Sequence, residues 1–133
     1  MKVIGSNAFY GCSALTTINM PNNLQNIGSS AFYGTVYYND SSHWENDVLY
    51  INEYLIKAKT TAPNSYSVKN NTKIIANNAF DGCTNLASIE IPGSVTHIGS
   101  YAFYNCKNLV DVLIEDGVET IGSYSFNKCI NVT

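Results

Sequence analysis

The sequence contains no arginine, and only 13% of its 133 residues are charged. Its seven lysines stand against ten acidic residues and form no basic cluster, which gives a net charge of -3. Because proteins bind nucleic acids largely by neutralising phosphates with lysine and arginine, this composition argues against a nucleic-acid partner. The missing arginine also removes the side chain best suited to bidentate binding of phosphate or carboxylate groups.

Long apolar runs are missing as well. No stretch approaches the roughly 18 apolar residues of a membrane span, so we expect no transmembrane segment. The residues after Lys2 include no long apolar stretch, so no signal peptide is visible. Uncharged polar residues are abundant instead, with 18 Asn, 13 Ser and 10 Thr. The length suits one domain over residues 1–133, which can bury roughly two-thirds of its unfolded surface.

The five phenylalanines reveal an internal repeat. Each lies five residues after an isoleucine, and the isoleucines are separated by 23, 48, 23 and 23 residues. Four of the five units begin Ile-Gly-Ser, whereas the third begins Ile75-Ala76-Asn77. We therefore expect a solenoid of about 23-residue coils that start near residues 4, 27, 75, 98 and 121. Since one coil cannot bury its own apolar face, neighbouring coils must stack on one another.

Each coil is predicted to contain a short strand. The segments Thr17–Met20 and Ser88–Ile91 alternate polar and apolar residues, which is the pattern of a strand with one buried face. The opening residues of each coil, up to the phenylalanine, are too few for a full helix. We expect a helical turn or a tight bend there, with Ala and Phe facing the core. The predicted fold class is an α/β repeat, mainly β with short helical turns.

The 48-residue spacing indicates one coil with an insertion. The excess of 25 residues falls at about 36–64 and contains the apolar runs Val48–Ile51 and Tyr54–Ala58. Two such runs around a two-residue turn predict a β-hairpin, which we expect to project from the coils. Its aromatic residues include Trp44, Tyr50 and Tyr54. Either these residues contact a partner, as residues of inserted loops often do, or they seal the gap that the insertion opens.

No arrangement typical of catalysis or metal binding is visible. The two histidines form no catalytic motif, and the acidic residues 111–119 predict a solvated face, with weak calcium binding as the alternative. Each cysteine lies three residues after a phenylalanine, at Cys12, Cys83, Cys106 and Cys129. Metal sites need shorter cysteine spacings, so we expect buried free thiols in one ladder rather than a metal site or disulfides. We expect neither enzyme activity nor a cofactor.

The outward positions of the predicted strands form a candidate face for a partner. If Ile18 and Met20 point into the core, then Thr17 and Asn19 point outward, and the same logic applies to the other coils. The predicted face consists of Thr17, Asn19, Ser65, Ser67, Ser88, Glu90, Asp111 and Leu113. Solenoids commonly bind partners along such extended faces. Trp44, Tyr50 and Tyr54 are the candidate contacts of the hairpin.

The pattern Ile-Gly-X-X-Ala-Phe-X-X-Cys-X-X-Leu-X-X-Ile-X-Ile-Pro, with its 23-residue period, resembles the BspA-type leucine-rich repeat, also called the Treponema pallidum type. This resemblance implies a right-handed leucine-rich-repeat solenoid with a β-sheet face. It also implies a surface or secreted location and a role in adhesion, because most such proteins are surface proteins of host-associated bacteria and parasitic protists.

The function expected from this resemblance is non-catalytic binding of a protein or glycan, such as host extracellular matrix. The alternative is a structural spacer that presents other parts of a larger surface protein. Both ends of the sequence fall inside a repeat, which suggests an excerpt of a longer protein. Terminal coils of a solenoid need capping, and neither end shows a distinct cap, so we also expect end-to-end self-association.

Overall fold

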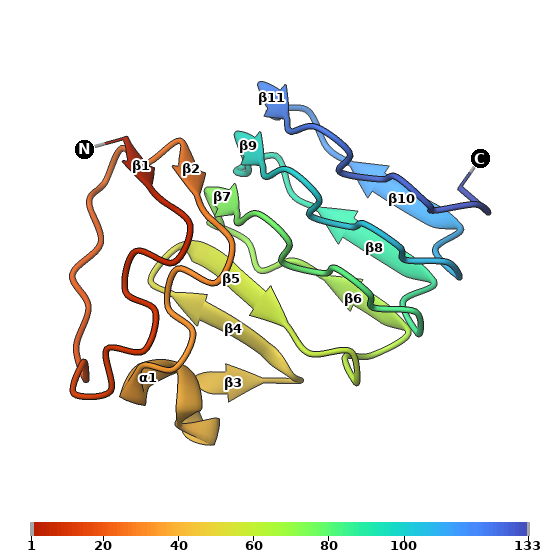
Figure 1. Cartoon of the computed structure of the whole chain (residues 1–133). Coiled ribbons are helices and arrows are strands. Elements are labelled where there is room, and N and C mark those ends of the chain that lie inside the picture. The colour runs from red at the N-terminus through yellow and green to blue at the C-terminus, as the bar shows by residue number, and fades with distance from the viewer. Residues whose placement is uncertain (1, 133) are drawn as a thin grey trace.

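The computed structural model describes residues 2–132 and confirms the predicted solenoid, with about five coils of about 23 residues (Figure 1). Strands outnumber helices, and within residues 2–132 helix is confined to the stretch 36–43. In chain order, the elements are β1 (Val3–Ile4), β2 (Asn26–Ile27), α1 (Val36–Asn39), the 3-10 helix η1 (Ser41–His43), β3 (Trp44–Glu45), β4 (Val48–Ile51), β5 (Tyr54–Ala58), β6 (Ser65–Ser67), β7 (Ile74–Ile75), β8 (Ser88–Ile91), β9 (His97–Ile98), β10 (Asp111–Ile114) and β11 (Thr120–Ile121).

Parallel pairing between successive coils builds the sheets (Figure 1). One sheet has the strand order β10-β8-β6, and its parallel register aligns Tyr66, Ile89 and Val112. Tyr66 and Ile89 are buried and Val112 is half-buried, so the predicted alternation holds in these strands. A second sheet has the order β11-β9-β7-β5-β4-β3, and β1 pairs with β2 separately.

The strand predicted at Thr17–Met20 is not formed, which corrects the expectation for the first coil. The segment about 23 residues later is the one that would pair with Thr17–Met20. It folds into α1 and η1 rather than into a strand. A helical segment offers no open strand edge, so Thr17–Met20 has no ladder partner there. The N–H group of Tyr37 in α1 does donate to the carbonyl of Leu15 at 3.2 Å, which keeps the two segments in contact.

The opening segments of the five coils, here termed head turns, comprise residues 4–12, 27–35, 75–83, 98–106 and 121–129. They are hydrogen-bonded turns, which fits the expectation of a helical turn or a tight bend. Two positions in every head turn adopt a left-handed backbone with φ between 55° and 79°: Asn7, Ser30, Asn78, Tyr101, Tyr124, Gly11, Gly34, Gly82, Asn105 and Lys128. Because a right-handed helix cannot continue through such residues, each head turn bends the chain instead.

Backbone hydrogen bonds join neighbouring head turns in sets of three rungs. The N–H groups of Asn78, Phe80 and Gly82 donate to the carbonyls of Ser100, Ala102 and Tyr104 at 3.0, 2.6 and 2.9 Å, respectively. Equivalent rungs join residues 4–12 to 27–35 and residues 98–106 to 121–129. The phenylalanine rings stack in the same register, with centroids 4.9 Å apart for Phe80 and Phe103.

The predicted hairpin is confirmed as β4 and β5, but it does not project from the coils. Strand β5 pairs in parallel with β7, which places the hairpin inside the second sheet. Its side chains face two cores: Val48, Leu55 and Ala58 contact the cluster of Phe80, whereas Leu49, Ile51 and Ile56 contact the cluster of Phe32. Strands buried on both faces have nearly continuous apolar sequences, which explains the two apolar runs.

The hairpin interrupts the ladder of head turns between residues 27–35 and 75–83. The N–H group of Ala58 donates to the carbonyl of Ala79 at 2.7 Å. By the register of the repeat, Phe32 would otherwise donate to that carbonyl. Within residues 2–132, the N–H groups of Ser30, Phe32 and Gly34 make no hydrogen bond.

Replacing Gly99 with alanine should destabilise the protein, because a Cβ there would lie 2.5 Å from the backbone nitrogen of Asn77. Overpacking of this kind costs about 1–3 kcal/mol. Gly5→Ala is the matched control in the first coil, since its Cβ would meet nothing within 4 Å. That variant should lose no stability and could gain up to about 1 kcal/mol. Denaturant unfolding measures both, and equal effects would contradict the close stacking of the coils.

Candidate functional site

The outward positions of β6, β8 and β10 form an exposed surface, here termed the sheet face. It consists of Ser65, Ser67, Ser88, Glu90, Asp111 and Leu113. The parallel register places Ser65, Ser88 and Asp111 in one row, with Ser67, Glu90 and Leu113 in the next. All six are exposed except Ser88, which is half-buried. Six of the eight predicted face residues therefore lie together on one sheet.

Thr17 and Asn19 complete the predicted face but do not lie on this sheet. Both side chains are exposed, as expected. Because no strand forms at Thr17–Met20, no strand register aligns them with the rows of the sheet face. The sheet face is therefore confined to the coils that follow the insertion.

The sheet face is polar, with one apolar side chain. The Ser67 hydroxyl donates to Glu90 Oε2 at 2.9 Å, which links β6 to β8 across the surface. Leu113 beside them remains 55% exposed. Two shallow hollows of about 350 and 300 Å³ adjoin this row, and Glu90 lines both. A partner on this surface would meet hydrogen-bonding groups around one apolar contact.

Two of the candidate hairpin residues pack against the protein itself. Tyr54 is 3% exposed, and its hydroxyl donates to the carbonyl of Pro21 at 2.6 Å. Trp44 is half-buried, and its Nε1–H donates to the carbonyl of Tyr38 at 2.8 Å. Lys59 Nζ lies 4.8 Å from the centroid of the Trp44 ring. Tyr54 is thus inaccessible to a partner because β5 lies inside the sheet, and this packing favours the sealing interpretation.

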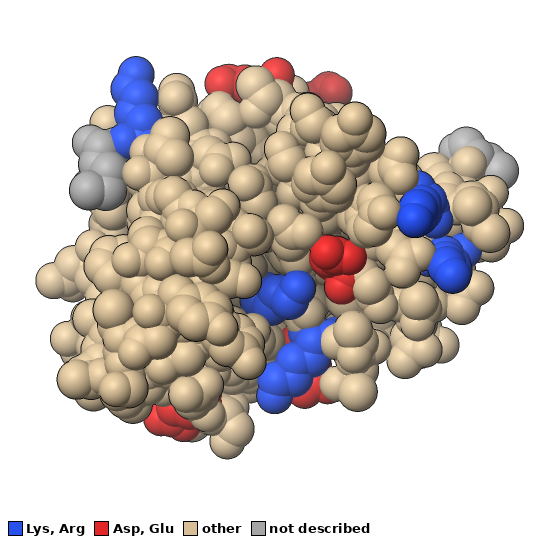
Figure 2. Space-filling model, in the orientation of Figure 1, with Lys and Arg blue, Asp and Glu red and all other residues tan. Residues whose placement is uncertain are grey.

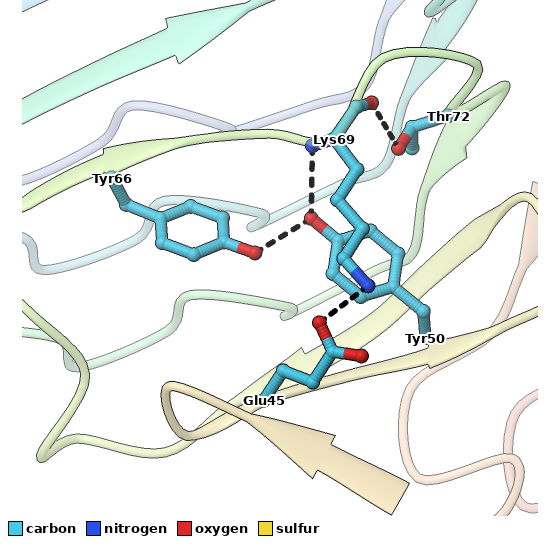
Figure 3. A network of polar contacts seen from close by, with 5 residues as sticks. All are labelled: Glu45, Tyr50, Tyr66, Lys69 and Thr72. Carbon is cyan, nitrogen blue, oxygen red and sulfur yellow. Dashed lines mark hydrogen bonds and ion pairs between the residues drawn. The ribbon is translucent and has the colours of Figure 1, made fainter.

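Tyr50 joins the hairpin to the segment after β6 through a polar network (Figure 3). Its hydroxyl lies 2.7 Å from that of Tyr66 and accepts a hydrogen bond from the backbone N–H of Lys69 at 3.2 Å. Lys69 Nζ pairs with Glu45 at 2.7 Å. Burial raises the pKa of Tyr66 well above its ordinary value, so this phenol stays neutral. The polar–apolar alternation of residues 65–68 predicts that Tyr66 points inward. It does not predict that the Tyr66 hydroxyl contacts Tyr50 of the hairpin.

Replacing Tyr50 with phenylalanine should destabilise the protein. The change leaves the Tyr66 hydroxyl and the Lys69 N–H without their shared partner, and such a loss costs about 1–3 kcal/mol. Tyr10→Phe is the control, because Tyr10 is 57% exposed and its hydroxyl makes no hydrogen bond within residues 2–132. If thermal unfolding shifted equally for both variants, the network would contribute no stability.

The cysteines are all free thiols, as predicted. Cys83 and Cys106 are buried, Cys129 is half-buried, and Cys12 is exposed, which corrects the expectation of burial for the first coil. The buried thiols donate to carbonyls of the preceding coil, as Cys106 does to Phe80 at 3.1 Å. Among the described residues, no preceding coil covers Cys12. Burial raises the pKa of Cys83 to about 11 and also raises that of Cys106.

A thiol reagent near neutral pH should modify Cys12 much faster than Cys83 or Cys106 in the native protein. The buried thiols are shielded, and their raised pKa values keep them protonated, whereas the thiolate is the reactive form. The unfolded protein should react at all four cysteines. Mass spectrometry after timed labelling identifies the modified residues, and rapid native modification of Cys106 would contradict this packing.

Among residues 2–132, no three His, Cys, Asp or Glu side chains lie close enough together to hold a metal ion. The same part of the chain contains no helix with the length and hydropathy of a membrane span.

The family described as BspA type Leucine rich repeat region matches residues 1–61 and 49–133, in six copies. This chain belongs to that family. No curated protein matches the sequence. The family assignment therefore rests on the repeat itself, which covers the whole chain.

Two solved structures resemble this leucine rich repeat chain. A leucine rich cell surface protein from Faecalibacterium prausnitzii A2-165 is 26% identical, with a TM-score of 0.58 over 99% of this chain. This chain spans 38% of that protein's length. The leucine rich repeat protein of T. pallidum is 21% identical, with a TM-score of 0.54, and the match covers 99% of this chain and 72% of that one. The second likeness shows the fold alone.

Proposed function

We propose that this chain is a non-catalytic binding module of a surface protein, and that its sheet face holds a protein or glycan partner in adhesion. Leucine rich repeat solenoids generally act as binding modules, and the similar protein from Faecalibacterium prausnitzii is described as a cell surface protein. Neither fact names a ligand. The proposal therefore depends on the geometry of this chain's own surface.

The in-register rows of the sheet face are the observation that carries the proposal. Ser67, Glu90 and Leu113 sit on three hydrogen-bonded parallel strands, so their backbone positions are fixed before a partner arrives. A preformed surface loses little conformational entropy on binding, which favours affinity. The small hydroxyl side chains donate and accept hydrogen bonds, and Leu113 supplies an exposed apolar contact.

Glu90→Lys should weaken or abolish binding to a partner found in a panel of immobilised host matrix proteins and glycans. The change reverses a charge at the centre of the sheet face and breaks the bond from Ser67. Glu119→Lys is the matched control, because it makes the same charge change at an exposed residue outside this sheet. Surface plasmon resonance should show a loss of at least about tenfold for Glu90→Lys only.

The panel also tests the spacer alternative. A spacer should bind no member of the panel and should tolerate both substitutions, and that result would overturn the proposal. Point substitutions are the suitable test because the hairpin is part of both cores. Removing residues 36–64 would unfold the protein rather than reveal a binding element. Self-association stays a prediction, and light scattering at high concentration measures it directly.

A further inference from the structure

A cavity of about 400 Å³ lies where the hairpin interrupts the ladder of head turns. Head turn 27–35 supplies one wall, head turn 75–83 supplies the other, and β5 contributes Lys57. This volume falls within the roughly 300–1,000 Å³ of small-molecule sites. Figure 2 shows a face that is mostly uncharged, with lysine and acidic side chains gathered around a hollow near its centre. We term this space the break cavity.

Backbone polar groups on both walls of the break cavity lack partners within residues 2–132. Ser30 and Phe32 line one wall, and their N–H groups make no hydrogen bond. In the first, third and fourth coils, the equivalent N–H groups donate to the next head turn, so these two are directed toward residues 75–83. On that side, the carbonyls of Asn77 and Asp81 accept no hydrogen bond from any residue in 2–132. Such groups are normally paired, and a bound molecule could pair with them.

The side chains of the break cavity add one positive and one negative group. Lys57 Nζ donates to the carbonyl of Asn78 at 2.8 Å, which leaves further N–H donors on the ammonium. Asp81 Oδ2 accepts from Asn78 Nδ2 at 2.9 Å and retains acceptor capacity. Burial lowers the pKa of Lys57, and the nearby Asp81 opposes that shift. The formal charges of the two side chains cancel.

An aromatic row ends at the break cavity. Tyr33 and Tyr38 line the cavity, with their ring centroids 5.2 Å apart. Tyr10 stacks on Tyr33 at 5.3 Å, and Trp44 meets Tyr38 edge-on at 5.1 Å. Tyr10 and Tyr33 remain 57% and 48% exposed. The row therefore offers exposed ring surface beside the polar walls of the cavity.

We propose that the break cavity binds a neutral saccharide. Sugar hydroxyls both donate and accept hydrogen bonds, which matches the N–H groups of one wall and the carbonyls and carboxylate of the other. The C–H face of a pyranose ring is apolar and can pack on tyrosine rings, whose faces carry partial negative charge. The balanced pair of Lys57 and Asp81 favours an uncharged sugar over an anionic one. This site shares no residue with the sheet face.

Titration of the intact chain with neutral mono- and disaccharides, followed by NMR chemical shifts, tests this proposal. Lys57→Met keeps the aliphatic stem but removes the ammonium, and Tyr33→Ala removes an exposed ring. Each should weaken binding at least about tenfold, as expected for the loss of a charged hydrogen bond or a stacking contact. The matched controls are Lys107→Met and Tyr124→Ala, at exposed positions outside the cavity. The controls and Glu90→Lys should bind as the intact chain does.

Three results would overturn the proposal. The first is that no neutral saccharide binds at millimolar concentration. The second is that Tyr33→Ala and Tyr124→Ala weaken binding equally. The third is that only acidic sugars or a peptide bind in the cavity. If thermal unfolding shows that Lys57→Met does not fold, the comparison of the two tyrosine variants decides the outcome, since both residues are exposed.

Discussion

Backbone hydrogen bonds between successive head turns set the spacing of the coils, and the other features depend on that spacing. Neighbouring head turns lie so close together that the residue after the opening isoleucine has no room for a side chain. A Cβ at Gly28, Gly99 or Gly122 would lie within 2.5 Å of the preceding head turn's backbone. The same spacing brings the rings of Phe80 and Phe103 into stacking contact and places buried thiols against carbonyls. The repeated residues are therefore consequences of one backbone geometry.

The third coil departs from this rule because Ala76 stacks on β5, although the N–H group of Asn77 still donates to the carbonyl of Ile27 in the preceding head turn at 2.9 Å. The N–H group of Ala76 donates to the carbonyl of Leu55 at 2.9 Å, and a methyl group is accommodated there. The insertion thus divides the core into two clusters and leaves polar backbone groups of Ser30 and Phe32 facing a cavity. An interruption of a regular repeat creates a surface that the repeat alone cannot provide.

Periodicity in the sequence predicted the coils, the hairpin and the two rows of the sheet face, because each depends on local alternation and register. It could not predict which neighbour a segment meets. Thr17–Met20 has a strand pattern but no strand edge to pair with, and Tyr54 is buried because β5 joins β7. The contact between Tyr50 and Tyr66 likewise depends on how the insertion folds back. The sequence carried two signals of the break, namely the 48-residue spacing and Ala76 in place of glycine.

The sheet face and the break cavity would give one chain two different binding surfaces, and the break cavity requires that the rungs stop at Ser30 and Phe32. Amide hydrogen exchange followed by NMR tests this claim most directly. We expect rapid exchange at Phe32, whose N–H makes no hydrogen bond within residues 2–132, and slow exchange at Phe80 and Phe103, whose N–H groups bond to the next coil. Protection of Phe32 equal to that of Phe80 would show that the ladder is continuous and would contradict the account.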